Sequence, residues 1–224
     1  MTAVAVHHVV TGPSDAPVVV LSNSLGSTHT MWDAQVDALS EHFRVVRYDT
    51  RGHGGSPVPA GPYDIDARNP ERVDRLVVLC TGAHLTPSSA WTDRAGNVRA
   101  NGSESVAEAV VARWFTPGFL DANPDVKASC EATVAATPTE GYASCCEVIA
   151  AMDLRADLPT ISAPTLAIAG ADAPATPPPH LAAIADAVQD GRLLVVPQAA
   201  HLANAEQPAT ITPEIIAHLT GASS

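Results

Sequence analysis

FRVVRYDTRGHGGS, residues 43–56, places an apolar run rich in β-branched residues directly before a cluster of turn-forming residues. This order is typical of a strand that ends in a tight loop. The run VVVL (18–21) precedes it, and LVVLC (76–80) and TLAIAG (165–170) follow it. Because these runs are continuous rather than alternating, they indicate strands buried on both faces of a parallel sheet.

Six ranges fit strands: Val4–Val10, Pro17–Ser22, Phe43–Asp49, Arg75–Thr81, Pro164–Gly170 and Arg192–Pro197. Helical periodicity lies between them in three ranges: Met31–His42, Pro179–Val188 and Pro213–Leu219. The last range follows Thr212, a capping residue, and has proline at its first helical position. Strands that alternate with helices predict an α/β fold with a mostly parallel sheet.

Residues 86–158 interrupt this alternation. They hold three helical segments and no convincing strand: Ser103–Phe115, Pro124–Ala135 and Thr139–Met152. A helical insertion between two strands of an α/β core is expected to form a lid over the carboxyl edge of the sheet, where binding sites lie. We therefore expect a core formed by residues 1–85 and 159–224, with a helical cap over 86–158.

The connection between Asp49 and Arg75 lacks an element that the sheet requires. Its 25 residues contain turn chemistry and a short piece broken by Pro70, but no amphipathic helix of three turns. A parallel pair of strands needs a crossover that normally carries a helix. We therefore expect a segment to be absent between Asp66 and Ala67. The strand Arg75–Thr81 should then pair with Phe43–Asp49 in a sheet one strand short.

Composition excludes several classes of partner. The 224 residues include 12 Lys+Arg against 24 Asp+Glu, a net charge of −12 without basic clusters. This balance argues against nucleic acid or an anionic membrane as the main partner. No apolar run reaches the roughly 18 residues of a membrane span, and the N-terminus carries no export signal. We expect a cytoplasmic protein.

Metal and disulfide sites are also not expected. The four cysteines form no C-x-x-C pair, and no disulfide framework is implied. His7 and His8 alternate across a predicted strand, so their imidazoles cannot converge on one metal ion. The sequence predicts neither a metal nor a cofactor.

Five segments carry a resemblance to a known family: VVVLSNSLGSTHTMWD (18–33), RYDTRGHGGS (47–56), GYASCCEVIAAMDLR (141–155), PTLAIAGADAPATPP (164–178) and VVPQAAHLANAEQP (195–208). The chain resembles the α/β-hydrolase superfamily over nearly its whole length and is most similar to the 3-oxoadipate enol-lactonases. The resemblance implies hydrolysis of a small lactone or carboxylic ester in aromatic catabolism. A nucleophilic serine, a histidine base and an acid would perform it without a cofactor.

The resemblance assigns roles to several positions. His201, just after a strand, is placed as the general base, which suits an imidazole near neutral pH. The position of the acid holds Ala173, with Asp172 one residue earlier as the nearest carboxylate. The loop after the second predicted strand supplies an oxyanion-hole amide at Leu25 and is shaped by Asn23 and Ser24.

The nucleophile is the exception, because no G-x-S-x-G elbow occurs in the chain. In the family this elbow belongs to the stretch that is expected to be absent after Asp66, roughly 30–40 residues or one βαβ unit. Ser24 and Cys80 remain possible substitutes. The sequence predicts an enol-lactonase-type hydrolase with impaired catalysis. Two alternatives stay open: a weak hydrolase in which His201 activates water directly, and an inactive remnant or binding protein.

Overall fold

The structure is a computed structural model that describes residues 4–63 and 72–222. The chain divides into two compact units. The first holds residues 1–64, 86–111 and 123–151, and the second holds 65–85, 112–122 and 152–224. Each unit has its own three-stranded sheet.

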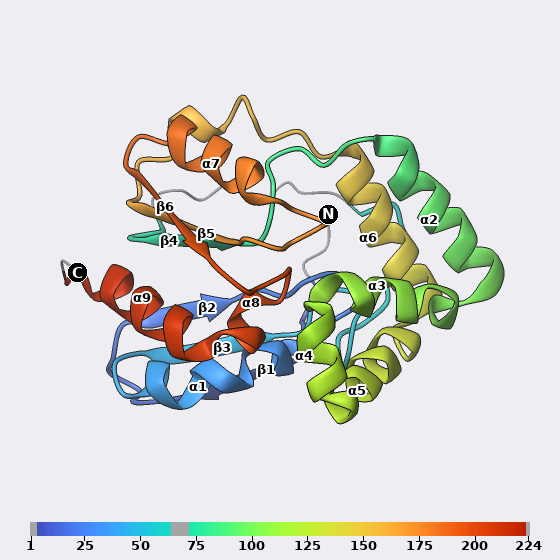
Figure 1. Ribbon diagram of the computed structural model, residues 1–224, viewed down its shortest axis with the longest axis horizontal. Helices are drawn as coiled ribbons and strands as arrows, with labels where there is room; N and C mark the ends of the chain where they lie inside the picture. The colour runs from blue at the N-terminus through green and yellow to red at the C-terminus, as the bar shows by residue number, and fades with distance from the viewer. Residues whose placement is uncertain (1–3, 64–71, 223–224) are drawn as a thin grey trace. The chain divides into compact units, whose positions relative to one another are not determined.

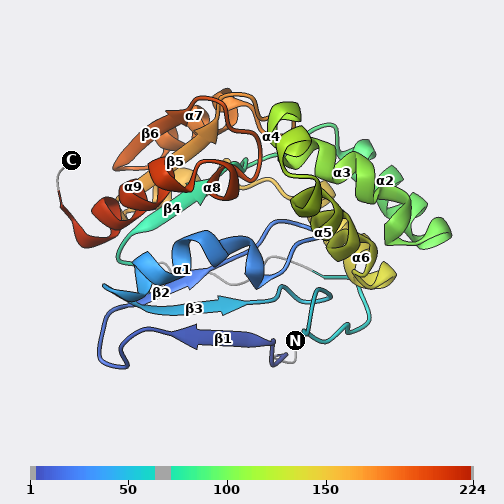
Figure 2. The same ribbon diagram turned by 60° about the horizontal axis from the view of Figure 1, so that its bottom comes forward.

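The sheet of the first unit contains β1 (His8–Thr11), β2 (Val18–Leu21) and β3 (Arg44–Tyr48), with β3 in the centre. Strands β2 and β3 are parallel, and β1 is antiparallel to β3. The connection from β2 to β3 carries η1 (His29–Trp32) and α1 (Asp33–Ser40), which lies along one face of the sheet (Figure 2). This crossover confirms the predicted helix over Met31–His42.

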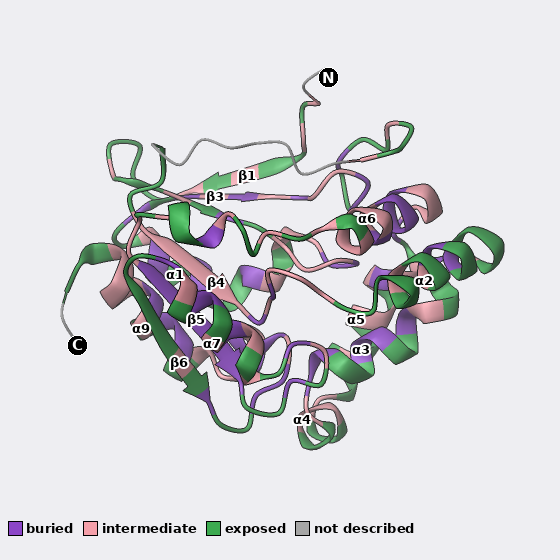
Figure 3. Ribbon diagram, turned by 90° about the horizontal axis from the view of Figure 1, so that it is seen from above, coloured by how far each residue is buried: buried purple, intermediate pink, exposed green. Residues whose placement is uncertain are grey.

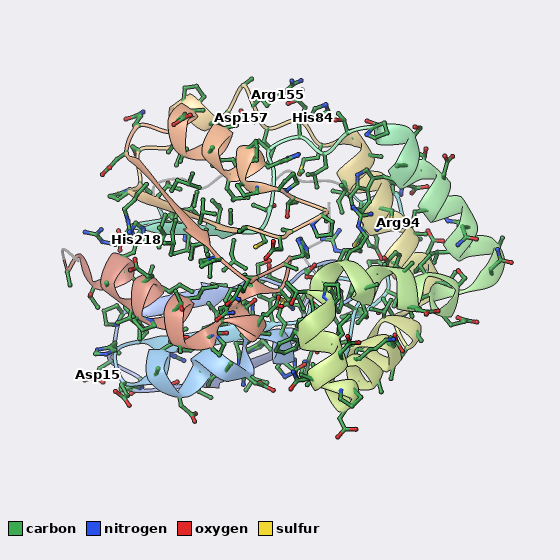
Figure 4. All side chains as sticks on the ribbon, viewed as in Figure 1. Asp15, His84, Arg94, Arg155, Asp157 and His218 are labelled. Atoms are coloured by element: carbon green, nitrogen blue, oxygen red, sulfur yellow. The ribbon has the colours of Figure 1, made fainter. Side chains whose placement is uncertain are left out.

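The helices of the first unit are α2 (Ser88–Asn101), η3 (Ser103–Val106), α3 (Ala107–Trp114, which continues into the second unit), α5 (Pro124–Ala135) and α6 (Thr139–Ala151). Helix α2 packs along α6, where Arg99 forms ion pairs with Glu140 and Glu147. Arg94, labelled in Figure 4, lies 4.7 Å from the ring centre of Trp91. Sequence patterning did not predict α2, because Ala95 and Val98 are its only buried residues.

The second unit has an all-parallel sheet of β4 (Leu76–Leu79), β5 (Thr165–Gly170) and β6 (Gly191–Val196), in that order. Helix α7 (Pro178–Ala187) forms the crossover from β5 to β6 and packs on both strands (Figure 1). Its other helices are α4 (Pro117–Ala122), η4 (Leu158–Thr160), α8 (Ala203–Glu206) and α9 (Pro208–Thr220). His218 of α9, labelled in Figure 4, lies with Nε2 3.1 Å from the carbonyl oxygen of Pro164.

Three expectations about the strands and helices were wrong. Strand β4 pairs with β5 and not with β3, because β1 and β2 already occupy both edges of β3. Among the strands of the described residues, only β5 is buried along its whole length (Figure 3), whereas Val18 and Val20 of β2 are each 60 % exposed. Helix α9 begins at Pro208, and Pro213 lies inside it.

The expected break between Asp66 and Ala67 lies outside the described residues. Within residues 49–63 and 72–75 the structure describes no strand between β3 and β4. None of the helices in the described parts of the chain is long and apolar enough to cross a membrane.

Candidate active-site residues

His201 lies in the second unit, in the turn between β6 and α8. Its Nδ1 atom is 3.1 Å from the Oγ1 of Thr176, and that hydroxyl donates to the carbonyl oxygen of Cys80 at 2.9 Å. A threonine hydroxyl has a single proton, and a carbonyl can only accept. Thr176 therefore accepts a hydrogen bond from Nδ1–H of His201, which leaves the lone pair of the imidazole on Nε2.

Burial, together with the smaller effect of the positive charge of Arg113, lowers the pKa of His201 to about 4. The imidazole is therefore neutral at pH 7. A neutral imidazole with its lone pair on Nε2 has the form that a general base requires. With a pKa this low, however, it is a weaker base than an ordinary histidine.

The position that the resemblance assigns to the acid carries no carboxylate that could pair with His201. Ala173 is buried, and Asp172 is exposed with its backbone N–H bonded to the carbonyl oxygen of Ala199. Asp172 lines a cavity of about 350 Å³ together with Thr116, Gly118, Phe119, Gln198, Glu206 and Gln207. Thr176 was not singled out in the sequence, although it belongs to the PATPP turn that supports the family resemblance.

Cys80 directly follows β4, has a positive φ of 46° and is almost fully buried. Its Sγ–H donates to the carbonyl oxygen of Ala200, 3.4 Å away. Burial raises the pKa of the thiol to about 11. At pH 7 roughly one molecule in 10,000 would carry the reactive thiolate, which favours a packing role over a nucleophilic one.

The predicted oxyanion loop lies in the first unit between β2 and η1. The amide of Asn23 donates to the carbonyl oxygen of Tyr48, and the hydroxyl of Ser27 donates to the carbonyl oxygen of Ser24 at 2.7 Å. The backbone N–H of Ser24 points to Sδ of Met31 at 3.2 Å, and Leu25 is half-buried. The buried Oδ1 of Asn23 has no hydrogen-bond partner among the described residues, so it could accept a bond from a ligand.

His53 fixes this loop from the neighbouring GHGG turn. Its Nε2 accepts the backbone N–H of Gly26 at 2.9 Å, and its Nδ1–H donates to the carbonyl oxygen of Arg51 at 3.2 Å. The side chain is fully buried, and burial lowers its pKa. The sequence alone does not predict a role for His53, because its partner at Gly26 lies 27 residues away.

Replacing His53 with alanine is expected to lower the free energy of unfolding by about 2 kcal/mol at pH 7.5, because a buried N–H of Gly26 loses its acceptor. The difference should shrink as the pH falls below about 6.5. Below that pH, His53 binds a proton more readily in the unfolded wild type than in the folded wild type, and this lowers the stability of the wild type. The variant has no histidine at this position, so its stability is not lowered in this way. Urea unfolding at pH 7.5 and 5.5 measures both effects. The exposed His42 offers the control variant H42A, and equal stability of H53A and H42A would contradict the assignment.

Comparisons with known proteins identify relatives of the chain. The model of the alpha/beta hydrolase family matches residues 18–213. The 3-oxoadipate enol-lactonase 2 of Acinetobacter baylyi is 34 % identical over 239 residues, covering 92 % of this chain and 89 % of the relative. Enol-lactonase 1 of the same organism is 34 % identical over 232 residues, covering 89 % and 87 %.

Two solved structures extend the comparison. The enol-lactonase from Burkholderia xenovorans LB400 matches with a TM-score of 0.92 at 35 % identity and covers 96 % of each chain. A hydrolase from Pseudomonas aeruginosa PA01 matches with a TM-score of 0.89 at 33 % identity and covers 95 % of this chain and 93 % of that one.

Each Acinetobacter alignment has more aligned positions than the number of residues of this chain that it covers. Coverage of 92 % of 224 residues is about 206 residues, against 239 aligned positions. Coverage of 89 % is about 199 residues, against 232 aligned positions. In each alignment about 33 positions of the lactonase therefore have no counterpart in this chain.

Proposed function

Because this chain belongs to the alpha/beta hydrolase family, we propose that it binds a small enol-lactone or carboxylic ester and hydrolyses it slowly, with His201 as the base. The observation that carries the proposal is the contact of His201 Nδ1 with Thr176, since it fixes the neutral tautomer whose lone pair is on Nε2. Thr176 acts here as a positioning residue for the tautomer.

In the proposed reaction, Nε2 of His201 takes a proton from a water molecule as the water oxygen attacks the carbonyl carbon. The tetrahedral intermediate carries its negative charge on the former carbonyl oxygen, which needs a hydrogen-bond donor. Its collapse breaks the bond between the carbonyl carbon and the ester oxygen, which receives the proton from the imidazolium. Alanine at position 173 provides no carboxylate to stabilise that imidazolium, which supports a slow reaction.

Two independent observations support the proposal that this chain catalyses hydrolysis more slowly than the lactonases do. The chain contains no G-x-S-x-G elbow, and about 33 positions of each Acinetobacter lactonase have no counterpart here. We infer that the elbow lies in that missing stretch. All four cysteines are free thiols, which fits the reducing cytoplasm that the sequence analysis expected.

Replacing His201 with alanine is expected to lower the hydrolysis rate of 3-oxoadipate enol-lactone and of 4-nitrophenyl acetate by about 100-fold, the usual contribution of a general base. In the wild type, kcat/KM should rise with pH through about 4 and level off above it, because only the neutral imidazole is active and the pKa of His201 is about 4. Steady-state rates between pH 3.5 and 8 measure both effects.

The variant H42A, at an exposed histidine, is the control and should keep the wild-type rate. Equal rates for H201A and the wild type would contradict the proposal and favour the binding-protein alternative. An active-serine phosphonate probe should leave the wild-type protein unlabelled. Stoichiometric labelling of a serine, Ser24 above all, would instead show that a nucleophile is present and contradict direct attack by water.

A further inference from the structure

The side chains of two histidines and one aspartate lie close together in the first unit. The proposed hydrolase mechanism uses none of these three residues. His7 lies just before β1, His29 begins η1, and Asp49 follows β3. Nδ1 of His7 is 2.9 Å from Oδ2 of Asp49, and Nδ1 of His29 is 2.9 Å from Oδ1 of the same carboxylate. One ligand atom from each residue lies within 4.8 Å of the other two.

These donor atoms are the ones that a zinc-like ion prefers. Imidazole nitrogen and carboxylate oxygen bind Zn²⁺ at about 2.0–2.2 Å, so two ligands of a tetrahedral ion lie about 3.3 Å apart. The two nitrogen–oxygen distances of 2.9 Å are already close to that separation. The two imidazoles face different oxygens of the carboxylate, so side-chain rotation must bring one ligand atom of each residue onto a single ion.

The cluster is held in place by its backbone. Oδ1 of Asp49 accepts the backbone N–H of His29 at 2.8 Å, and Oδ2 accepts that of Gly55 at 2.9 Å. The backbone N–H of Asp49 donates to the carbonyl oxygen of His7, and that of His7 donates to Oγ of Ser56. Hydrogen bonds of this kind orient metal-binding carboxylates in known sites.

Two glycines of the turn that follows Asp49 have no side chains, and this leaves room for the side chains of Asp49 and His7. A Cβ atom on Gly54 would lie 2.3 Å from Oδ2 of Asp49, and one on Gly55 would lie 2.9 Å from Cγ of His7. The turn therefore brings its backbone against the carboxylate and one imidazole, which larger residues would prevent.

Charge and access also suit a cation. The side chain of Asp49 is 2 % exposed, whereas His29 is 18 % and His7 is 43 % exposed, so the site opens to solvent on the side of the imidazoles. Burial tends to raise the pKa of Asp49, but hydrogen bonds from the backbone and side chain of His29 and from Gly55 lower it to about 2. The carboxylate therefore carries a negative charge at neutral pH.

We propose that His7, His29 and Asp49 bind one divalent transition-metal ion of the Zn²⁺ class, with a solvent molecule completing four ligands. On binding, each imidazole would turn the lone pair of Nδ1 to the metal and keep its proton on Nε2. The sequence pattern predicted no metal, because His7 and the adjacent His8 alternate across a strand. His29 and Asp49, which are distant in sequence, supply the other ligands.

The experiment is titration of the full chain with Co²⁺ at pH 7.5, followed by its visible d–d absorption, and competition with Zn²⁺. A four-coordinate Co²⁺ spectrum that Zn²⁺ abolishes is expected for the wild type. The variants H7A and H29A should each weaken Co²⁺ binding by about 100-fold, since each removes one of three protein ligands. His8 is adjacent to His7 and exposed, so H8A is the matched control and should bind Co²⁺ as the wild type does.

Removal of Asp49 could unfold the turn, so the two histidine variants carry the test, and far-UV circular dichroism confirms that they are folded. Absence of a saturable Co²⁺ spectrum in the wild type would overturn the proposal. Undiminished binding in both H7A and H29A would overturn it as well. The assay involves neither His201 nor hydrolysis, so its result is independent of the proposed function.

Discussion

Insertion of the stretch of about 33 enol-lactonase residues that we infer to be missing here, and to carry the G-x-S-x-G elbow, is expected to raise kcat/KM by about 10⁴-fold or more. The insertion would be made at the predicted break between Asp66 and Ala67, which lies outside the described residues. The reason is chemical: a serine activated by His201 would replace direct attack by water, and covalent catalysis divides one difficult step into two easier ones. Steady-state hydrolysis of 3-oxoadipate enol-lactone measures the gain.

The matched control is the same insertion with alanine in place of the elbow serine, which restores the strand but not the nucleophile. It should stay at the rate of the parent chain. Adding A173D to the active insertion should raise the rate further, because a carboxylate at the acid position stabilises the imidazolium of His201. If the active insertion folds, shows no gain and takes up no phosphonate probe, the missing elbow does not explain the impairment.

Replacing Gly141 with alanine is expected to lower the free energy of unfolding by about 3 kcal/mol, the upper range for overpacking a core. Gly141 lies in the first turn of α6, where a Cβ atom would be 2.2 Å from the carbonyl oxygen of Gly52. The contact is between two backbones, so no side chain can rotate to make room. Urea unfolding followed by circular dichroism measures the loss.

Gly96 provides the matched control for G141A. It also lies in a helix of the first unit, α2, but a Cβ atom there would meet nothing within 4 Å. The variant G96A should therefore stabilise the protein by about 0.5–1 kcal/mol, because alanine restricts the unfolded chain and favours the helix. Equal effects of G141A and G96A would show that α6 can move away from the turn at Gly52 without cost.

Local sequence patterns predicted most of the elements. All six predicted strands overlap observed ones, and Pro124–Ala135 was predicted with its observed bounds. These segments are recognised because an apolar run bounded by turn residues, or a proline at a helix start, restricts the backbone locally. Helix α2 escaped prediction because it buries little apolar surface, and its position depends on packing against α6 and on the ion pairs of Arg99.

The candidate site was predicted less completely. His201 and the loop at Asn23–Leu25 were proposed from the family resemblance, and they remain predictions. Thr176 was overlooked, because a threonine within a proline-rich turn carries no catalytic signal until its hydroxyl is found at an imidazole. The pairing of β4 with β3 was wrong, because the sequence does not state that β2 already occupies the second edge of β3.

The sequence by itself determined the fold class, the family and the absence of a serine elbow, because each of these is written in contiguous residues. Only the tertiary structure decided which strands share an edge, which nitrogen of His201 carries its proton, and that His7 and His29 meet at Asp49. These features depend on hydrogen bonds between groups that are 20 or more residues apart, and such bonds form only when folding has brought the groups out of water.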